Sequence, residues 1–148
     1  MLGMKTYTRE YIDRCRSKVE SDASAYRNLI AAARNQPASG DEPLNSAIEA
    51  FEATFFNNMV LILEELFVHR LRTIEGKDGN PLNEVRVICN SLMNNNGIMS
   101  ADTTIKFDPS GSVLKYKVGD EIKMNEADFV AISSAYFAEI DSKYLATR

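Results

Sequence analysis

The first regular pattern of apolar residues lies in residues 9–35. Its apolar positions recur at intervals of three and four, and they are Ile12, Cys15, Val19, Ala23, Tyr26, Ile30 and Ala33. This spacing places them on one face of an α-helix, so we predict an amphipathic helix here. Thr8 can cap its start, and Pro37 disfavours helical geometry in the residue before it, so the helix ends near residue 35.

A second and more apolar helix is predicted over residues 42–72. It starts where Asp41 and Glu42 precede Pro43, because acids and proline favour a first helical turn. Its apolar residues fill two adjacent stripes, Leu44, Ile48, Phe51, Phe55, Met59, Ile62 and Leu66, then Phe56, Val60, Leu63, Phe67 and Leu71. From Phe55 onward more than half of the helix surface is apolar, which is typical of a central helix packed by several neighbours or by a second subunit.

Two further helices and a hairpin are predicted in the second half of the chain. Asn80 and Pro81 can start a helix over residues 81–95, which Gly97 follows. Residues 103–124 contain alternating polar and β-forming residues around an Asp-Pro-Ser-Gly turn, which favours a small β-hairpin. A capping box, Asn125 with Asp128, then starts a last amphipathic helix over residues 126–145.

These elements predict a mainly α fold, a four-helix bundle-like domain with the small β-hairpin inserted before the last helix. The whole chain, residues 1–148, is expected to form this one domain, since its length and 45% hydrophobic content suffice for one core. Asn57 and Asn58 lie within the apolar run of the second helix. Buried amides need partners, so we expect them to form hydrogen bonds across a helix interface.

Charge and segment lengths exclude several partners. The net charge of −4 gives no global basic surface, which disfavours nucleic acid. The most apolar run, Phe55 to Val68, is shorter than the ~20 residues of a membrane span and contains charges, so we expect no membrane insertion. The N-terminus lacks the features of a secretory signal. Cys15 and Cys89 fit neither a zinc nor a disulfide pattern, which indicates a reducing, cytoplasmic location and two small core residues.

Polar residues concentrate in residues 69–86, which we call the polar connector. Its candidate ligand-binding side chains are His69, Arg70, Arg72, Glu75, Lys77, Asp78, Asn83, Glu84 and Arg86. Helix capping, helix-dipole complementation and a glycine-permitted turn account for most of these residue types. The arginines exceed what capping requires, and arginines can hold an anion bidentately while a histidine transfers a proton. The connector is therefore a helix–turn–helix junction and also a candidate anion site.

No motif identifies a catalytic residue, a metal or a cofactor. Glu65 and His69 share a helix face, but a chain with one histidine lacks the ligands of a di-iron carboxylate site. Leu82 stands where a calcium loop needs a ligand. The Gly76-Lys77 pair lacks the rest of a phosphate loop, and no nucleophile lies in a recognisable elbow. We therefore expect no bound metal and no cofactor.

Two functions remain open. The first is association, with a second copy of this chain or with a protein partner, through the apolar central helix and the polar connector. The second is a binder of a small anionic ligand, or an enzyme, that uses the polar connector. The two differ in whether the connector side chains converge on a cleft or extend into solvent.

Overall fold

The computed structural model describes residues 3–37 and 40–146, and within these ranges the chain is mainly helical. The helices are α1 (Arg9–Arg34), α2 (Glu42–Leu66), α3 (Arg72–Glu75), α4 (Pro81–Asn94), the 3₁₀ turn η1 (Pro109–Gly111) and α5 (Glu126–Tyr144). None of the helices in the described part is long and apolar enough to cross a membrane. Pairing between extended segments is limited there to isolated bridges.

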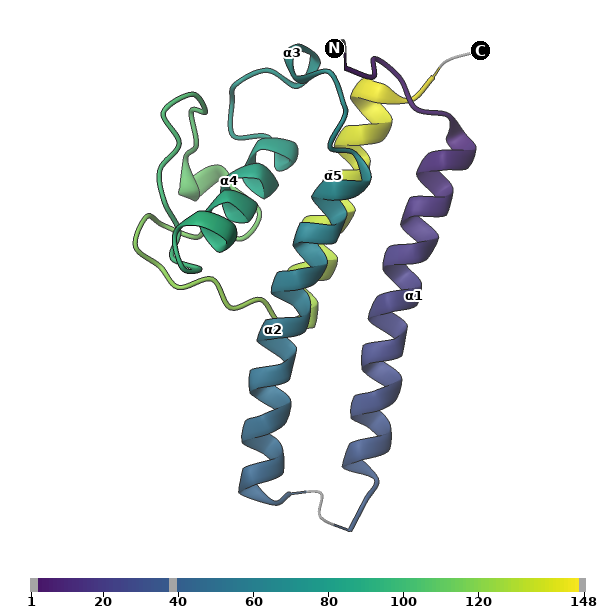
Figure 1. Ribbon diagram of the computed structural model, residues 1–148, viewed down its shortest axis with the longest axis vertical. Coiled ribbons are helices and arrows are strands. Elements are labelled where there is room, and N and C mark those ends of the chain that lie inside the picture. Colours follow the sequence, from purple (N-terminus) through teal and green to yellow (C-terminus); the bar gives the residue numbers. More distant parts are fainter. Residues whose placement is uncertain (1–2, 38–39, 147–148) are drawn as a thin grey trace.

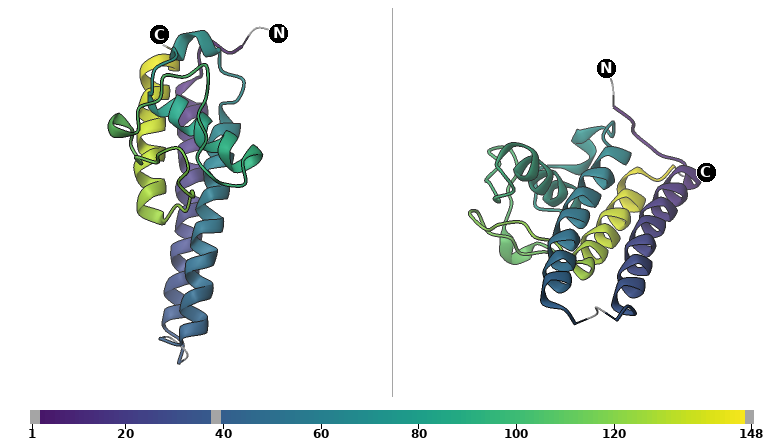
Figure 2. Two further views of the ribbon diagram at one scale, coloured as in Figure 1. Left: turned by 90° about the vertical axis from the view of Figure 1, so that its left-hand side faces the viewer. Right: turned by 60° about the horizontal axis from the view of Figure 1, so that its bottom comes forward.

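The two longest helices, α1 and α2, form an antiparallel pair that carries the other elements at one end (Figure 1). Helix α5 packs against both of them, and α4 packs against α2 and α5. The irregular segment between α4 and α5 lies on the outer side of α4 (Figure 2). At the other end α1 and α2 continue past α5 as a hairpin of two helices (Figure 1, Figure 2). One end of the molecule is therefore several helices thick, whereas the other contains two.

Aromatic side chains fill the core where α1, α2 and α5 meet. Phe56 is fully buried, and its ring lies 4.8 Å from that of Tyr26 and 5.5 Å from that of Phe129. Phe67 occupies the same role nearer the connector, edge-on to Tyr7 at 5.0 Å. Edge-to-face and offset pairs of this kind add to the stabilisation from burying apolar surface.

The predicted starts of α1 and α5 are confirmed by their caps. Thr8 Oγ1 accepts the backbone N–H of Tyr11 at 3.1 Å, and α1 ends at Arg34, one residue before the predicted end. Asn125 and Asp128 form the predicted capping box at the start of α5. These signals are read correctly from sequence because each depends on residues within one helical turn.

The predicted second helix is too long. It ends at Leu66, and residues 72–75 form the separate turn α3. The cause is the N-terminal segment, which pairs with residues 69–71: Met4 N–H donates to the His69 carbonyl at 2.7 Å, and Leu71 N–H donates to the Met4 carbonyl at 2.8 Å. The apolar surface of α2 is also covered by several helices only at the connector end, so the helix is central over only part of its length.

The predicted β-hairpin is wrong. Residues 103–124 are described throughout and form an irregular segment with the turn η1. Its extended stretches pair with other parts of the chain, Lys106 with Asp78 and Glu121 with Ile98, so they do not pair with each other. Asn57 holds the end of this segment, because its side chain donates to the Ile122 carbonyl at 2.9 Å and accepts Met124 N–H at 3.1 Å. The expected amide partner is thus a loop backbone rather than a helix, and Asn58 is exposed.

The central position of Phe56 predicts a large loss of stability on truncation. Phe56→Ala should lower the free energy of unfolding by about 3–5 kcal/mol, because it removes a ring that touches α1 and α5 and leaves a cavity. Urea denaturation followed by circular dichroism measures this change. Val130→Ala is the control, since Val130 is 47% exposed on α5, and it should change stability by less than about 0.5 kcal/mol. Equal losses in the two variants would contradict the assigned core.

Candidate functional site

The polar connector folds as a tight turn whose carbonyls and amides are held by two asparagines. Asn80 caps α4 by accepting Asn83 N–H at 3.1 Å, as predicted, and its amide donates to the Glu75 carbonyl at 2.8 Å. Asn83 donates to the carbonyls of Gly76 and Asp78 at 3.1 and 2.7 Å. Gly76 has φ +79°, a left-handed conformation that favours glycine. These contacts assign Asn83, a ligand candidate, to shaping the turn.

Arg70 points into the interior, and its side chain is fully buried. Its Nε donates to Glu75 Oε2 at 2.5 Å, and its Nη1 donates to Glu64 Oε1 at 3.0 Å. The same Nη1 reaches the Phe67 carbonyl and the Tyr136 hydroxyl, at 3.1 and 3.0 Å. A buried guanidinium requires this density of acceptors, because an unpaired internal charge costs several kcal/mol.

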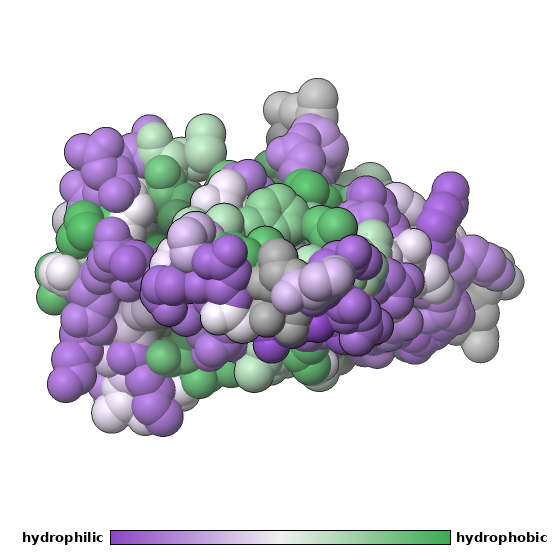
Figure 3. Space-filling view, turned by 90° about the horizontal axis from the view of Figure 1, so that it is seen from below, coloured by the Kyte–Doolittle hydropathy of each residue, from purple (hydrophilic) through white to green (hydrophobic). Residues whose placement is uncertain are grey.

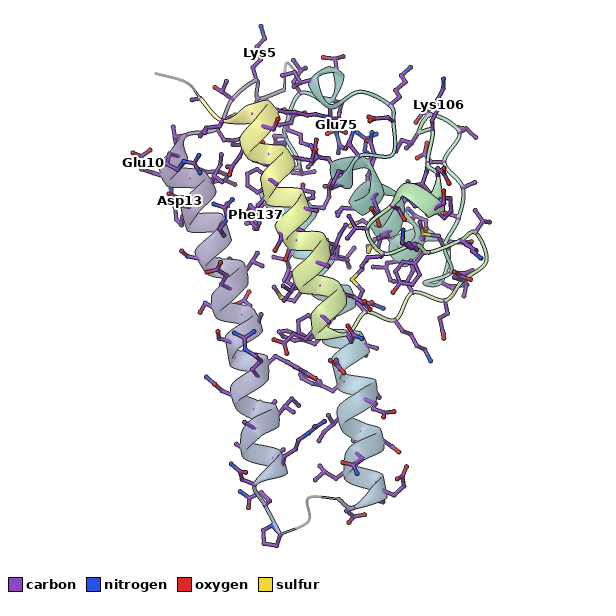
Figure 4. The ribbon with its side chains drawn as sticks, turned by 180° about the vertical axis from the view of Figure 1, so that it is seen from behind. Lys5, Glu10, Asp13, Glu75, Lys106 and Phe137 are labelled. Carbon is purple, nitrogen blue, oxygen red and sulfur yellow. The ribbon has the colours of Figure 1, made fainter. Side chains whose placement is uncertain are left out.

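Glu75 is the second centre of the cluster and is shared by three arginines. Besides Arg70, its carboxylate accepts Arg72 at 3.3 Å and also Arg86. Arg72 reaches Glu64 as well, at 3.2 Å. Figure 4 shows Glu75 inside the connector end, close to α4 and α5. We call Glu64, Arg70, Arg72, Glu75, Arg86 and Tyr136 the buried arginine cluster.

The surroundings of Arg70 and Tyr136 in the cluster keep both side chains protonated. Burial alone would lower the pKa of Arg70, but Tyr136 and the carboxylates of Glu64 and Glu75 outweigh it and raise that pKa above its ordinary value. Burial, with the nearby Glu64 charge, raises the pKa of Tyr136 well above its ordinary value, although Arg70 opposes the shift. Tyr136 therefore stays protonated and donates to Glu64 Oε1 at 2.9 Å.

The structure brings together four of the candidate residues and separates the rest. Arg70, Arg72, Glu75 and Arg86 converge in the cluster. Three further candidates, His69, Lys77 and Asp78, lie on the surface rather than in the cluster. Sequence reasoning missed two members, Glu64 and Tyr136, because each lies in a helical stripe with apolar neighbours. The sequence did contain one sign of Glu64, because this charged residue has the helical spacing of the buried apolar positions Val60, Leu63 and Phe67.

Glu84 holds the segment that follows η1 against α4. It is buried, and its two carboxylate oxygens accept the backbone N–H groups of Val113 and Leu114, each at 2.9 Å. Burial raises the pKa of Glu84 above its ordinary value, although these two N–H groups and Lys115 act in the opposite direction. Glu84 thus anchors the segment after η1 to α4 through these two hydrogen bonds.

The described residues contain no group of side chains of the kind that binds a metal ion. No three His, Cys, Asp or Glu side chains there are grouped as a metal site. Both cysteines are free and buried, as predicted, and burial raises the pKa of the Cys89 and Cys15 thiols, which disfavours the reactive thiolate. The cluster's hydrogen bonds are mostly directed at its own members, an arrangement that rigidifies the connector.

A second candidate region is the far end of the α1–α2 hairpin. The N-terminus of α5 meets this hairpin at Arg27 and Glu52: Arg27 pairs with Glu126 at 2.5 Å, and Glu52 accepts Glu126 N–H at 3.1 Å. Residues 28–34 of α1 and 42–51 of α2 lie beyond that point, and we call them the open arm. The arm is two helices thick (Figure 2, left), so each helix is covered on one side only.

The open arm carries apolar residues around its full circumference on α1. Residues 29–33 read Leu-Ile-Ala-Ala-Ala, five apolar positions in a helix that turns once every ~3.6 residues. Packing on α2 can cover one side, so the remainder faces solvent, and Leu29 is 55% exposed. Phe51 on α2 is 42% exposed, although it stacks on Tyr26. Figure 3, seen from this end, shows apolar surface between hydrophilic residues.

Comparison with protein-family models, with curated proteins and with solved structures gives no match to this chain. The functional conclusions below therefore depend on the geometry of these two regions.

The cluster predicts that Arg70 is essential for stability. Arg70→Ala leaves the carboxylates of Glu64 and Glu75 buried without their main partner, which should cost about 3–5 kcal/mol of unfolding free energy. Urea denaturation measures the loss. Lys18→Ala, which removes an exposed pair with Asp22, is the control and should cost about 0.5 kcal/mol or less. A loss below about 1 kcal/mol for Arg70→Ala would contradict the structural role of the cluster.

Glu84 predicts a defined pH dependence. Its raised pKa means that the folded state binds the proton more tightly than the unfolded state, so its contribution is largest below the ordinary glutamate pKa and is lost as the pH rises through the folded value. Glu84→Gln cannot titrate, and it places an amide N–H against a backbone donor, which should cost about 1–3 kcal/mol. The stability gap between the wild type and this variant should therefore be larger near pH ~4 than near pH ~7. Urea titrations at both values check this, and a gap that widens with pH would contradict it.

Proposed function

We propose that this protein acts by self-association, with two copies joining through their open arms. The observation that carries the proposal is the apolar turn of residues 29–33, which the fold leaves covered on one side only. A helix that is apolar all round is normally buried on all sides. The polar connector, which the sequence offered as part of the same surface, is left out of this proposal because Arg70 and Glu75, the centre of its arginine cluster, are enclosed.

The charges of the arm favour a second copy over an unrelated partner. Arg34 is the basic residue of the α1 part, whereas Glu42 and Glu49 are the acidic residues of the α2 part. These three line one shallow depression near the tip, yet none makes an ion pair within the described residues. A two-fold axis across the arms would place α1 of each copy beside α2 of the other, so each basic edge would meet an acidic edge.

The dimensions of the arm indicate a weak, reversible dimer. About ten residues at ~1.5 Å each give a length of ~15 Å, and two adjacent helices give a width of ~20 Å. The resulting face is well below the ~800 Å² per partner of a standard stable interface. We therefore expect a dissociation constant on the order of 10–100 μM, within the range of transient complexes.

The proposal includes the finer architecture and the location expected from sequence. The contacts of α4 with α2 and α5, and of α1 with α2 and α5, support one bundle-like domain of the four longer helices. The two free cysteines support a reducing, cytoplasmic location, where thiols persist.

Sedimentation equilibrium over a range of protein concentrations tests the self-association. The wild type should populate a dimer as the concentration approaches ~100 μM, and Leu29→Glu should weaken the dimer at least ~30-fold, because it places a charge in the apolar contact. Val118→Glu is the matched control: Val118 is 65% exposed in the segment before α5, outside the arm, and this variant should dimerise normally. A wild type that stays monomeric at millimolar concentration would refute the proposal.

A charge exchange tests the predicted orientation. Arg34→Glu alone should weaken the dimer, because it brings acid against acid across the interface. The double variant Arg34→Glu with Glu49→Arg should restore it, since the two edges are then complementary again. If Leu29→Glu dissociates the dimer but the double variant does not restore it, the open arm is still the interface. The two-fold pairing of α1 with α2 would then be wrong.

A further inference from the structure

A basic recess lies on the connector side of the molecule, away from the open arm. Its lining comes from α3, the turn after it, α4 and the segment before η1: Arg72, Thr73, Gly76, Lys77, Arg86, Thr104 and Ile105. The volume of the recess is about 270 Å³. That is slightly below the ~300–1,000 Å³ of pockets for drug-sized ligands, so the recess suits a smaller molecule.

Two guanidinium groups reach this recess already held in place. Arg72 is fixed by Glu64 and Glu75, at 3.2 and 3.3 Å, and Arg86 is fixed by Glu75. Their side chains are 38% and 29% exposed, so both are anchored in the cluster and still accessible from outside. Ordering an arginine costs side-chain entropy, and here the cluster carries that cost before any ligand arrives.

Arg72 and Arg86 still have N–H groups that form no hydrogen bond within the cluster. Arg72 uses each terminal nitrogen for one carboxylate, and each such nitrogen carries two N–H groups. Arg86 donates to Glu75 through one terminal nitrogen, and its Nε is buried without a hydrogen-bond partner in the described part of the chain. A buried donor without a partner is costly and rare in folded proteins, so an acceptor at this place would stabilise the protein.

The charge of the lining selects an anion. It contains three cations and no carboxylate, and Lys77, the third cation, makes no ion pair among the described residues. Asp102, the acid close enough to Arg86 to feel its charge, is occupied by the Thr104 hydroxyl at 2.7 Å and by the backbone N–H groups of Thr104 and Ile105. The remaining lining is Gly76, two threonines and Ile105, which is buried.

We propose that this recess binds a small phosphate monoester, with its phosphoryl oxygens held by Arg72, Arg86 and Lys77 and its organic part against Ile105. A guanidinium matches phosphate bidentately. A monoester carries about −1.5 to −2 charges at neutral pH, which suits three cations better than the single charge of a carboxylate. The site does not depend on the dimer, because the recess and the open arm lie at different ends of the α1–α2 pair (Figure 1).

Isothermal titration with inorganic phosphate, at constant ionic strength in chloride, tests the proposal with the full chain. Phosphate should bind at one site, and acetate should bind at least ~10-fold more weakly because it carries one charge. Lys77→Ala should weaken phosphate binding roughly 10-fold without a change in stability, since Lys77 is exposed and makes no ion pair in the described residues. Arg86→Lys should weaken it by at least as much, because lysine lacks the planar fork.

Lys106→Ala is the matched control. Lys106 is exposed, and its backbone N–H donates to the Lys77 carbonyl at 2.7 Å, but it is absent from the lining of the recess (Figure 4 labels it). Its removal should change the phosphate affinity less than ~2-fold, as expected for a nearby solvent-screened charge. Amide NMR shifts on phosphate addition should be concentrated at Gly76, Thr104 and Ile105.

Three results would overturn the site. They are no phosphate binding at millimolar concentration, equal weakening by Lys77→Ala and Lys106→Ala, and acetate binding as tight as that of phosphate. Either of the first two results would mean that the basic residues contribute to solubility or to non-specific attraction of anions. The third would mean that the recess binds a carboxylate rather than a phosphate monoester.

Discussion

The buried positive charge of Arg70 is the constraint on which the connector end of the fold depends. A guanidinium with no exposed surface must be surrounded by acceptors, and those acceptors come from three different elements: Glu64 on α2, Glu75 on α3 and the Tyr136 hydroxyl on α5. The hydrogen bonds of its Nε and Nη1 therefore fix three elements relative to one another, whereas its Nη2 has no partner in the described part of the chain. The arginine also binds the end of α2, because the Phe67 carbonyl accepts its Nη1.

The two ends of the α1–α2 pair are consequently built on different principles. At the connector end, polar groups are internal, paired and held by hydrogen bonds, and the N-terminal segment adds backbone contacts through Met4. At the arm, no ion pair joins the two helices among the described residues, and they meet through apolar side chains, including the buried Ile48 and Phe51, which stacks on Tyr26. Hydrophobic contact is non-directional, so the apolar surface of the arm favours burial but does not by itself select the partner. A rigid end suits a small ligand, whereas an apolar end suits a second copy.

Sequence reasoning succeeded where structure is decided within one helical turn. Thr8, Asn80 and the Asn125–Asp128 box mark helix starts that the structure confirms. The predictions were wrong where the local structure depends on residues that are distant in sequence. The hairpin failed because Glu84, buried on α4, takes the N–H groups of Val113 and Leu114, which hold that segment away from strand geometry. The cluster was predicted in part, since the surplus arginines were visible, whereas their partners on α2 and α5 are separated from them in sequence and resemble core positions.

That surplus now has a physical meaning. Three guanidinium groups of the cluster, from Arg70, Arg72 and Arg86, face two carboxylates, from Glu64 and Glu75. Arg70 is enclosed, so it consumes the interior oxygens, and the remaining two arginines share what is left at the cluster's outer edge. The carboxylates do not fully neutralise Arg72 and Arg86 at that edge, so N–H donors of these arginines remain available toward the basic recess. Lys77, which forms no ion pair in the described residues, lies beside them. The hydrogen-bond network that stabilises the interior also supports the proposed anion site at the surface, because a network ordered from inside presents its unused donors in a fixed geometry.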